Sequence, residues 1–424
     1  MDASQIISIV VFVVAMVAIM TEKVHRALIA IIGATILNVV QILPFDKAVE
    51  HIDFNTLGVL MGMMMFVAVV KQSGAFEFLA IKCARLAKGD PWRIMVLFVL
   101  LTAVLSAFLD NVTTVLLIGP MTITICRLLE INPVPFFFTQ IMASNIGGTA
   151  TLIGDPPNIM IGSAAGYNFA DFIAVDGPVV LIIIAAIIPV FYLMYGKNIK
   201  ANEQHKAAIM ELDEHDYIKN PRLLRISGIM IIFVVLGFML HGQLNVESSV
   251  IALAAAGIIM LVSGESIEEA LKGVEWTTLC FFGGLFVIVG AMSETGVIAM
   301  LAQALIDATG GNVFVTMLAI LIGSAIISSF LDNIPFVATM IPIILALQAD
   351  GIDPAPLWWA LSLGACLGGN GTLIGASANV VLADISKKFG HEITFIGFLK
   401  HGFPVMLLTI AISAVYLILR FPPT

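Results

Sequence analysis

The chain has 424 residues, of which 60% are hydrophobic and only 12% are charged. Its mean hydropathy is +1.05, whereas a water-soluble domain carries roughly twice this share of charged residues. These values exclude a soluble globular protein, and the net charge of −9 says little, because charge in a membrane protein matters by its position.

Long apolar segments follow one another along the chain and predict membrane-spanning helices. A helix needs roughly 17 apolar residues to cross a bilayer, and continuous apolar runs indicate helices, whereas alternation would indicate barrel strands. We read the first segment as a retained span, since no Lys or Arg precedes it and no clear cleavage site follows it. The clearest segments are residues 6–20, 27–43, 57–70, 179–194, 226–240, 250–262, 279–292 and 403–419.

Other classes of protein find no support in the sequence. The cysteines Cys83, Cys126, Cys280 and Cys366 form no CxxC pair, so we expect neither disulfides nor a metal site. GxSxG, HExxH and Walker motifs are absent, and we therefore expect no enzyme and no cofactor. Nothing indicates nucleic-acid binding.

The chain contains an internal repeat. Ser-Ala-Phe-Leu-Asp-Asn at 106–111 recurs as Ser-Ser-Phe-Leu-Asp-Asn at 328–333. Gly-Gly-Thr-Ala-Thr-Leu-Ile-Gly at 147–154 recurs as Gly-Gly-Asn-Gly-Thr-Leu-Ile-Gly at 368–375. Because the matching positions include polar residues and glycines, chance similarity between apolar segments does not explain them.

The repeat divides the chain into two modules, 1–199 and 226–424, joined by the charged linker 200–225. In each module we expect an odd number of spans, a hairpin that enters and leaves the membrane on one side, and a broken helix. An odd number inverts the second module, so the predicted fold class is an all-α polytopic membrane protein. It has two inverted-topology repeats with about 10 transmembrane helices, two re-entrant hairpins and broken helices at the midplane. The expected hairpins are 93–130 and 312–349, and the expected broken helices are 135–165 and 357–386.

The distribution of basic residues gives an orientation. If both termini lie outside the cell, the inner loops and the linker hold all 20 Lys and Arg residues except Lys47 and Arg420. The acidic loop 265–275 is the weak point of this topology. We therefore expect a multi-pass protein of the cell (inner) membrane with both termini extracytoplasmic.

Inverted repeats with interrupted helices are typical of alternating-access transporters, whose binding sites lie at the breaks. Here the hairpin tips carry Asp-Asn pairs and the broken helices carry Gly-rich loops, where free backbone groups and helix dipoles can hold an ion. The candidate substrate- or ion-binding residues are Asp110, Asn111, Thr113, Gly148, Thr149, Thr151, Asp155, Asn158, Asp332, Asn333, Asn370, Thr372, Ser377 and Asn379.

The three aspartates in this set allow two interpretations. Each can cap a half-helix, a role that Ser, Thr or Asn fills nearly as well. A carboxylate at membrane depth is costly, which favours a function for Asp110 and Asp332 beyond capping. For Asp155 both interpretations stay open, because its counterpart is Ala376 and the two prolines after it suit a pure cap.

These motifs resemble a known family. Residues 108–114 and 145–158 resemble the arsenite permease, NhaD-type antiporter and P-protein group of the ion transporter superfamily, and 365–379 is most similar to the P-protein-like branch. The resemblance implies a fold similar to the sodium/dicarboxylate symporters, an elevator-like motion and usually a homodimer in the lipid bilayer. Those symporters have a neutral Ser-Asn-Thr tip, whereas this chain has Asp110-Asn111 and Asp332-Asn333, whose charge disfavours a bound dianion.

Several transport functions remain open. A carboxylate that binds either a proton or a metal ion can couple their exchange, so we expect H+ or Na+ as the coupling ion. The resemblance favours efflux of arsenite or antimonite in exchange for protons. A Na+/H+ antiporter and a Na+- or H+-coupled transporter of an organic anion, such as citrate or a dicarboxylate, are the alternatives. A channel is disfavoured, because it needs a continuous pore.

Overall fold

The computed structural model describes residues 1–21 and 23–423. Within these ranges every regular element is helical, and nine helices are long and apolar enough to cross a membrane. The chain is therefore an all-helical polytopic membrane protein, which confirms the fold class predicted from its composition and repeat.

The two repeats contribute equivalent helices in the same order. The second repeat begins at Pro221, before the expected boundary at 226, because Asn220 caps the helix and a proline suits its first position. The first repeat holds α1 (Ala3–Met20), α2 (Arg26–Val39), α3 (Phe45–Glu50), α4 (Phe54–Lys71), α5 (Ala75–Leu86), α6 (Pro91–Phe108), α7 (Asn111–Leu128), α8 (Val134–Thr149), α9 (Pro156–Ala165) and α10 (Phe169–Phe191). A π-helical turn (Tyr192–Gly196) continues α10 at the end of this repeat, and the linker holds α11 (Glu203–Glu211) and a 3-10 turn (Glu214–Tyr217). The second repeat holds α12 (Pro221–Leu244), α13 (Ser248–Ser263), α14 (Ile267–Lys272), α15 (Trp276–Glu294), α16 (Val297–Thr309), α17 (Val313–Phe330), α18 (Asn333–Ala349), α19 (Ala355–Gly368), α20 (Ser377–Lys388) and α21 (Phe395–Arg420).

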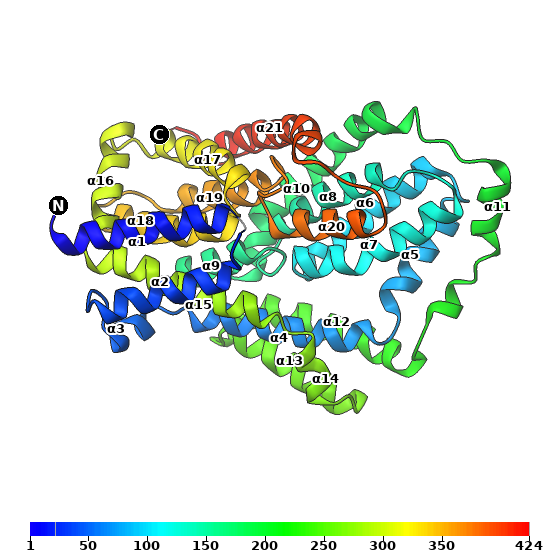
Figure 1. Ribbon diagram of the computed structural model, residues 1–424, viewed down its shortest axis with the longest axis horizontal. Helices are drawn as coiled ribbons and strands as arrows, with labels where there is room; N and C mark the ends of the chain where they lie inside the picture. The colour runs from blue at the N-terminus through cyan, green and yellow to red at the C-terminus, as the bar shows by residue number, and fades with distance from the viewer. Residues whose placement is uncertain (22, 424) are drawn as a thin grey trace.

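Two helical hairpins point at each other from opposite ends of the molecule. One is formed by α6 and α7 and the other by α17 and α18, and their tips meet near the middle of the long axis (Figure 1). At each tip a leucine in extended conformation, Leu109 or Leu331, ends the first helix, and an aspartate starts the second. Both termini lie toward the α16 end, and α11 lies at the opposite end.

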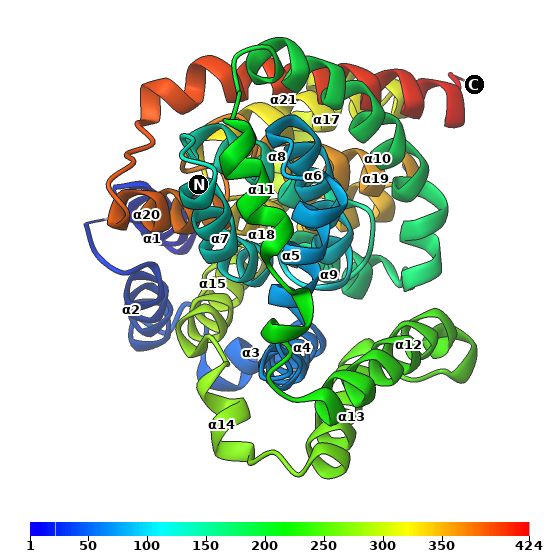
Figure 2. The same ribbon diagram turned by 90° about the vertical axis from the view of Figure 1, so that its right-hand side faces the viewer.

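The linker is held against the first repeat. Seen end-on, α11 crosses in front of the bundle (Figure 2), where it packs against α5 and α7. Ile209 of α11 is fully buried in an apolar cluster with Ile81 and Met121. The ion pair between Lys219 and Glu77, at 2.7 Å, lies at the surface, and such a pair contributes only about 0–1 kcal/mol. The burial of Ile209 therefore contributes more than this ion pair to holding the linker.

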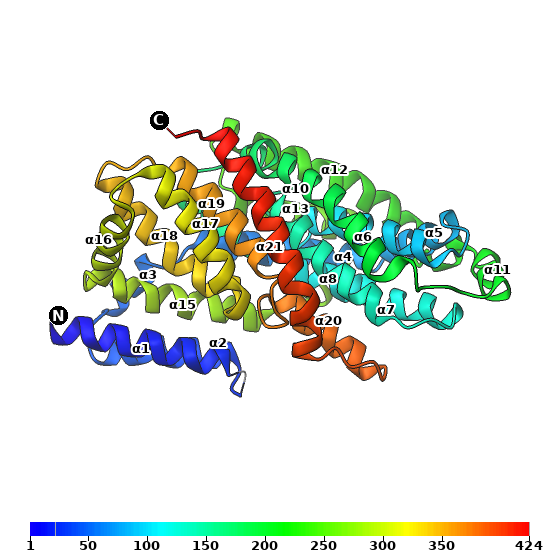
Figure 3. The same cartoon turned by 90° about the horizontal axis from the view of Figure 1, so that it is seen from above.

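Helices of one repeat pack along helices of the other. The α4 helix lies along α13, and α2 lies along α15. Figure 3 shows α1, α2 and α15 together along one edge of the molecule. A Cβ atom on Gly62 would lie 2.6 Å from the backbone carbon of Ala252, and one on Gly284 would lie 2.6 Å from that of Ala30. Helices in lipid associate through such close backbone packing, so these glycines bring the two repeats into contact.

Gly284→Ala should destabilise the fold, because the added Cβ would meet the Ala30 backbone at 2.6 Å. Overpacking of this kind costs about 1–3 kcal/mol. Gly283→Ala is the matched control, since a Cβ there meets no heavy atom within 4 Å and alanine favours the helix. Thermal unfolding of the two purified variants in detergent measures the difference, and equal melting temperatures would contradict the close packing.

Candidate functional site

The hairpin tips use their aspartates as helix caps. Asp110 accepts the Thr113 backbone N–H at 2.8 Å, and the Thr113 hydroxyl donates to its second oxygen at 2.5 Å. Asp332 accepts the Ile334 backbone N–H at 3.1 Å. Each carboxylate therefore satisfies a backbone donor that the start of a helix leaves unpaired.

In the broken helices, asparagine side chains satisfy the carbonyl groups that the break leaves free. The Asn158 amide donates to the carbonyls of Gly148, Thr149 and Thr151 at 3.5, 3.1 and 3.0 Å. Asn379 repeats this arrangement in the second repeat, at 2.8 and 3.0 Å from two carbonyls of its own break. Because the last carbonyls of a helix have no partner within it, these amides are needed to keep each break buried.

Threonine side chains tie each break to the hairpin of its own repeat. The Thr151 hydroxyl donates to the Ala107 carbonyl, and the Thr372 hydroxyl donates to the Ser329 carbonyl at 2.5 Å. The Thr149 hydroxyl bonds at 2.8 Å to a carbonyl of its own helix. These hydroxyl protons are engaged by backbone groups, so the three threonines fix the shape of the loops.

Glycines allow the two arms of each loop to touch. A Cβ on Gly148 would lie 2.6 Å from the Gly154 carbonyl oxygen. In the second repeat, a Cβ on Gly375 would lie 2.7 Å from the Gly369 carbonyl oxygen. No larger residue fits at these positions without moving the backbone, which explains the Gly-rich sequence of both loops.

Asp155 lies where both hairpin tips meet the first break. It has no exposed surface and, unlike the tip aspartates, makes no capping hydrogen bond at the start of α9. The Asn111 amide lies 3.4 Å from its Oδ1 atom, and the Asn333 amide lies 3.3 and 3.2 Å from its two oxygens. One carboxylate thus connects two predicted site residues, Asn111 of the first repeat and Asn333 of the second.

A network of amides surrounds this carboxylate. The Asn145 amide donates to the side-chain oxygens of Asn370 and Asn379, each at 3.0 Å. Its own side-chain oxygen accepts from Asn111 at 3.3 Å. The two breaks and the first hairpin tip are therefore linked by side chains that can both donate and accept.

A small cavity of about 20 Å³ lies against these residues. Three carboxylates line it, those of Asp110, Asp155 and Glu275, together with the single base Arg26. A site of roughly 10–15 Å³ holds one water molecule, so this cavity accommodates one species of that size. Its lining is net negative and suits a cation.

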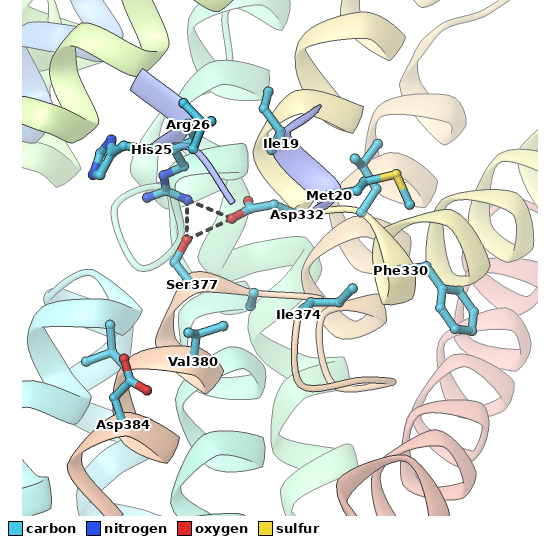
Figure 4. A pocket seen from close by; sticks show the side chains of 14 residues that line it. Ile19, Met20, His25, Arg26, Phe330, Asp332, Ile374, Ser377, Val380 and Asp384 are labelled. Carbon is cyan, nitrogen blue, oxygen red and sulfur yellow. Dashed lines mark hydrogen bonds and ion pairs between the residues drawn. The ribbon is translucent and has the colours of Figure 1, made fainter. Parts of the chain in front are cut away.

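A larger cavity of about 490 Å³ opens beside the small one. Figure 4 shows Arg26, Asp332 and Ser377 directed toward one another in it. The Arg26 guanidinium lies 2.8 Å from an Asp332 oxygen and 2.5 Å from the Ser377 hydroxyl, which donates to the same Asp332 oxygen at 2.8 Å. Arg26 and Ser377 line both cavities, so this ion pair stands between them.

The structure divides the predicted site residues into three groups. Asp110, Asn111, Asp155 and Asn333 line the small cavity, while Asp332 and Ser377 hold the ion pair beside it. The remaining residues support them by capping the tip or shaping the breaks; they are Thr113, Gly148, Thr149, Thr151, Asn158, Asn370, Thr372 and Asn379.

Sequence reasoning missed Arg26, Glu275 and Asn145 as members of the site. Glu275 matches Asp53 in the repeat, which is a signal that could have singled it out. Asn145 aligns with Cys366, so the repeat itself gives no hint of its role. Arg26 starts a separate apolar helix, and only the packing of α2 brings it to the hairpin tip.

Comparison with known proteins identifies the family. The sequence profile of the family CitMHS, described as "Citrate transporter", matches residues 16–364. The chain belongs to this citrate transporter family. The CitMHS family is part of the ion transporter superfamily. The match therefore confirms the superfamily suspected from the motifs and makes this chain a membrane transporter.

Other proteins are similar to this chain in sequence or in fold. It is 44% identical to an uncharacterized transporter of Mycobacterium bovis, over 98% of each chain. It is 33% identical to the P protein of Homo sapiens, over 94% of this chain and 58% of that protein. Its fold is similar to that of the YdaH transporter of Alcanivorax borkumensis, with a TM-score of 0.60, 16% identity and coverage of 88% and 87% of the two chains.

The contrast between the aspartates predicts different effects on stability. Asp110→Ala should lower the melting temperature, because it removes a cap worth about 1 kcal/mol, whereas Asp110→Asn should retain most of it. Asp155→Asn should leave the melting temperature unchanged or raise it, since Asp155 caps no helix and its charge is buried. Unfolding in detergent checks both, and a larger loss for Asp155→Asn than for Asp110→Ala would contradict the assignment.

Proposed function

We propose that this transporter couples its cycle to H+ or Na+ and that Asp155 binds the coupling cation between the hairpin tips. The supporting observation is the environment of Asp155, which is fully buried, caps no helix and contacts amides of both hairpins. A buried carboxylate without a basic partner is costly unless a proton or cation neutralises it. A bound cation supplies the missing charge.

The neighbouring amides suit this role. Asn111 and Asn333 direct N–H groups at Asp155, and a half turn of each amide would present its oxygen instead. Carboxylate, amide and unwound backbone oxygens are the ligands that transporters of this architecture use for Na+. A proton on Asp155 needs no such turn, so the same residues can hold either ion in alternation.

We propose an elevator-like alternating-access cycle in which the Arg26–Asp332–Ser377 contact closes one side of the site. Arg26 belongs to α2, which packs on α15, whereas Asp332 and Ser377 start α18 and α20. A movement of the hairpin and broken helix relative to α2 breaks this contact and joins the two cavities. With the basic linker in the cytoplasm, both termini lie outside.

The geometry supports Na+/H+ exchange best among the candidate functions. A cavity of about 20 Å³ has room for a bare cation. Arsenite efflux, favoured by the motif resemblance, is the second candidate, because arsenous acid is uncharged and brings no repulsion to the three carboxylates. Citrate, suggested by the family description, requires Arg26 to leave Asp332 before an anion meets any free positive charge.

Two substitutions separate ion binding from movement. Asp155→Asn should abolish stabilisation of the protein by Na+, because the amide has no charge to be neutralised. Asp332→Asn should retain Na+ binding and slow transport, because it weakens the contact between the cavities. Na+-dependent shifts in melting temperature report binding, and proton flux in liposomes with an enclosed pH-sensitive dye reports transport. Undiminished Na+ binding by Asp155→Asn would refute the proposed site.

The same liposomes identify the solute. They are challenged in turn with Na+, Li+, arsenite and citrate, with the Asp155→Asn protein as the control. Proton flux with Na+ or Li+ and with no other solute is the expected result and eliminates arsenite. Flux with arsenite alone, or with citrate alone, would replace the exchanger by the corresponding solute transporter.

A further inference from the structure

A second buried carboxylate lies outside the ion site described above. Asp176 of α10 has no exposed surface, and its Oδ2 atom lies 2.7 Å from the Ser362 hydroxyl of α19. Its Oδ1 atom is buried and meets no hydrogen-bond partner among the described residues. Nor does any base in the described part of the chain form an ion pair with it. An ionised carboxylate in this position would be desolvated without compensation.

The Ser362 hydroxyl lies between two side-chain oxygens, and each of these short contacts needs a hydrogen between its two oxygen atoms. It is 2.7 Å from Asp176 Oδ2 and 2.7 Å from the side-chain oxygen of Asn158. The orientation of Asn158 is determined, because its nitrogen donates to three backbone carbonyls. A hydroxyl has one hydrogen, so it can serve only one of these short contacts, and two oxygens at this distance repel without a proton between them.

We propose that Asp176 is a second proton-binding site, occupied in this conformation, whose proton holds Ser362 against Asn158. The protonated Asp176 Oδ2 donates to the Ser362 oxygen, and the Ser362 hydroxyl donates to the Asn158 oxygen. Both short contacts, Asp176–Ser362 and Ser362–Asn158, then have their hydrogen. The second repeat carries nothing equivalent, since Asp176 lies two positions before Pro178 and the residue two positions before the matching Pro404 is Gly402.

The proton on Asp176 acts on the ion site through Asn158. When it leaves, the Ser362 hydroxyl turns to the carboxylate, and the Asn158 oxygen retains only the Cys366 thiol at 3.5 Å. Asn158 holds the carbonyls of the break, and its backbone N–H donates to the Asp155 carbonyl at 2.9 Å. Loss of the proton therefore loosens the loop that positions Asp155, which weakens cation binding there. This step rests on the proposed function.

The surroundings of Asp176 contain few other titratable groups. On α21, Arg420 acts on it electrostatically and Tyr416 donates to a carbonyl of α10 at 2.7 Å. Cys366 is the titratable residue of α19, and α8 carries no charged residue. On α12, the ring of His241 contacts a backbone carbonyl of its own loop. The distant Arg420 is the one full charge that these helices direct at Asp176.

Infrared spectroscopy tests the proton directly. The wild-type protein at neutral pH should show the C=O stretch of a buried carboxylic acid that Asp176→Asn lacks. Asp171→Asn is the matched control, because Asp171 lies on the same helix, is partly exposed and should leave the band unchanged. A spectrum in which Asp176→Asn loses no such band would overturn the proton site, whatever the transport activity proves to be.

Cation affinity against pH tests the coupling. In the wild type, loss of the proton from Asp155 should raise Na+ affinity, and loss of the proton from Asp176 should make it fall by roughly fivefold or more. Asp176→Asn mimics the protonated acid and should keep the rise without the fall. Ser362→Ala should also lack the fall while retaining the infrared band. A fall that persists in both variants would overturn the coupling. If the wild type binds no Na+, the proposed function is refuted. The infrared result decides the proton site in either case.

Discussion

Buried backbone groups without partners are the constraint on which this structure depends. Two helices break inside the molecule, and no water reaches the carbonyl groups left at each break. Asn158 and Asn379 reach back to these carbonyls, and Thr151 and Thr372 tie the loops to the hairpins. The polar side chains at the centre of the molecule are thus needed for the breaks to exist at all, and the proposed ion site lies beside them.

The two repeats supply the same framework with different chemistry. Matching amides and threonines shape both breaks, but Asp155 aligns with Ala376, Asn145 aligns with Cys366, and Asp176 aligns with Gly402. Each of these differences adds an ionisable or amide group to the first repeat. Symmetry therefore accounts for the shape of the site, and its loss accounts for Asp155, the carboxylate that contacts both hairpin tips.

Much of the fold was predictable because its signals are local. Repeated Asp-Asn pairs located the hairpin tips, and Gly-rich loops located the breaks, since both depend on short-range backbone requirements. The roles of the aspartates were not predictable in the same way. Asp110 caps its helix and Asp155 does not, a difference set by backbone angles and neighbouring tips. Arg26 and Asp176 reach their partners only through the packing of helices distant in sequence.

The proposed binding of the coupling cation by Asp155 also has a consequence for how the membrane potential acts on the cycle. Asp155 together with one monovalent cation is electrically neutral, whichever ion is bound. The potential does work of about 2.3 kcal/mol per elementary charge per 100 mV, and a neutral site that crosses the membrane experiences none of it. One-for-one exchange of the proposed cations at such a site would be driven by their concentration gradients alone.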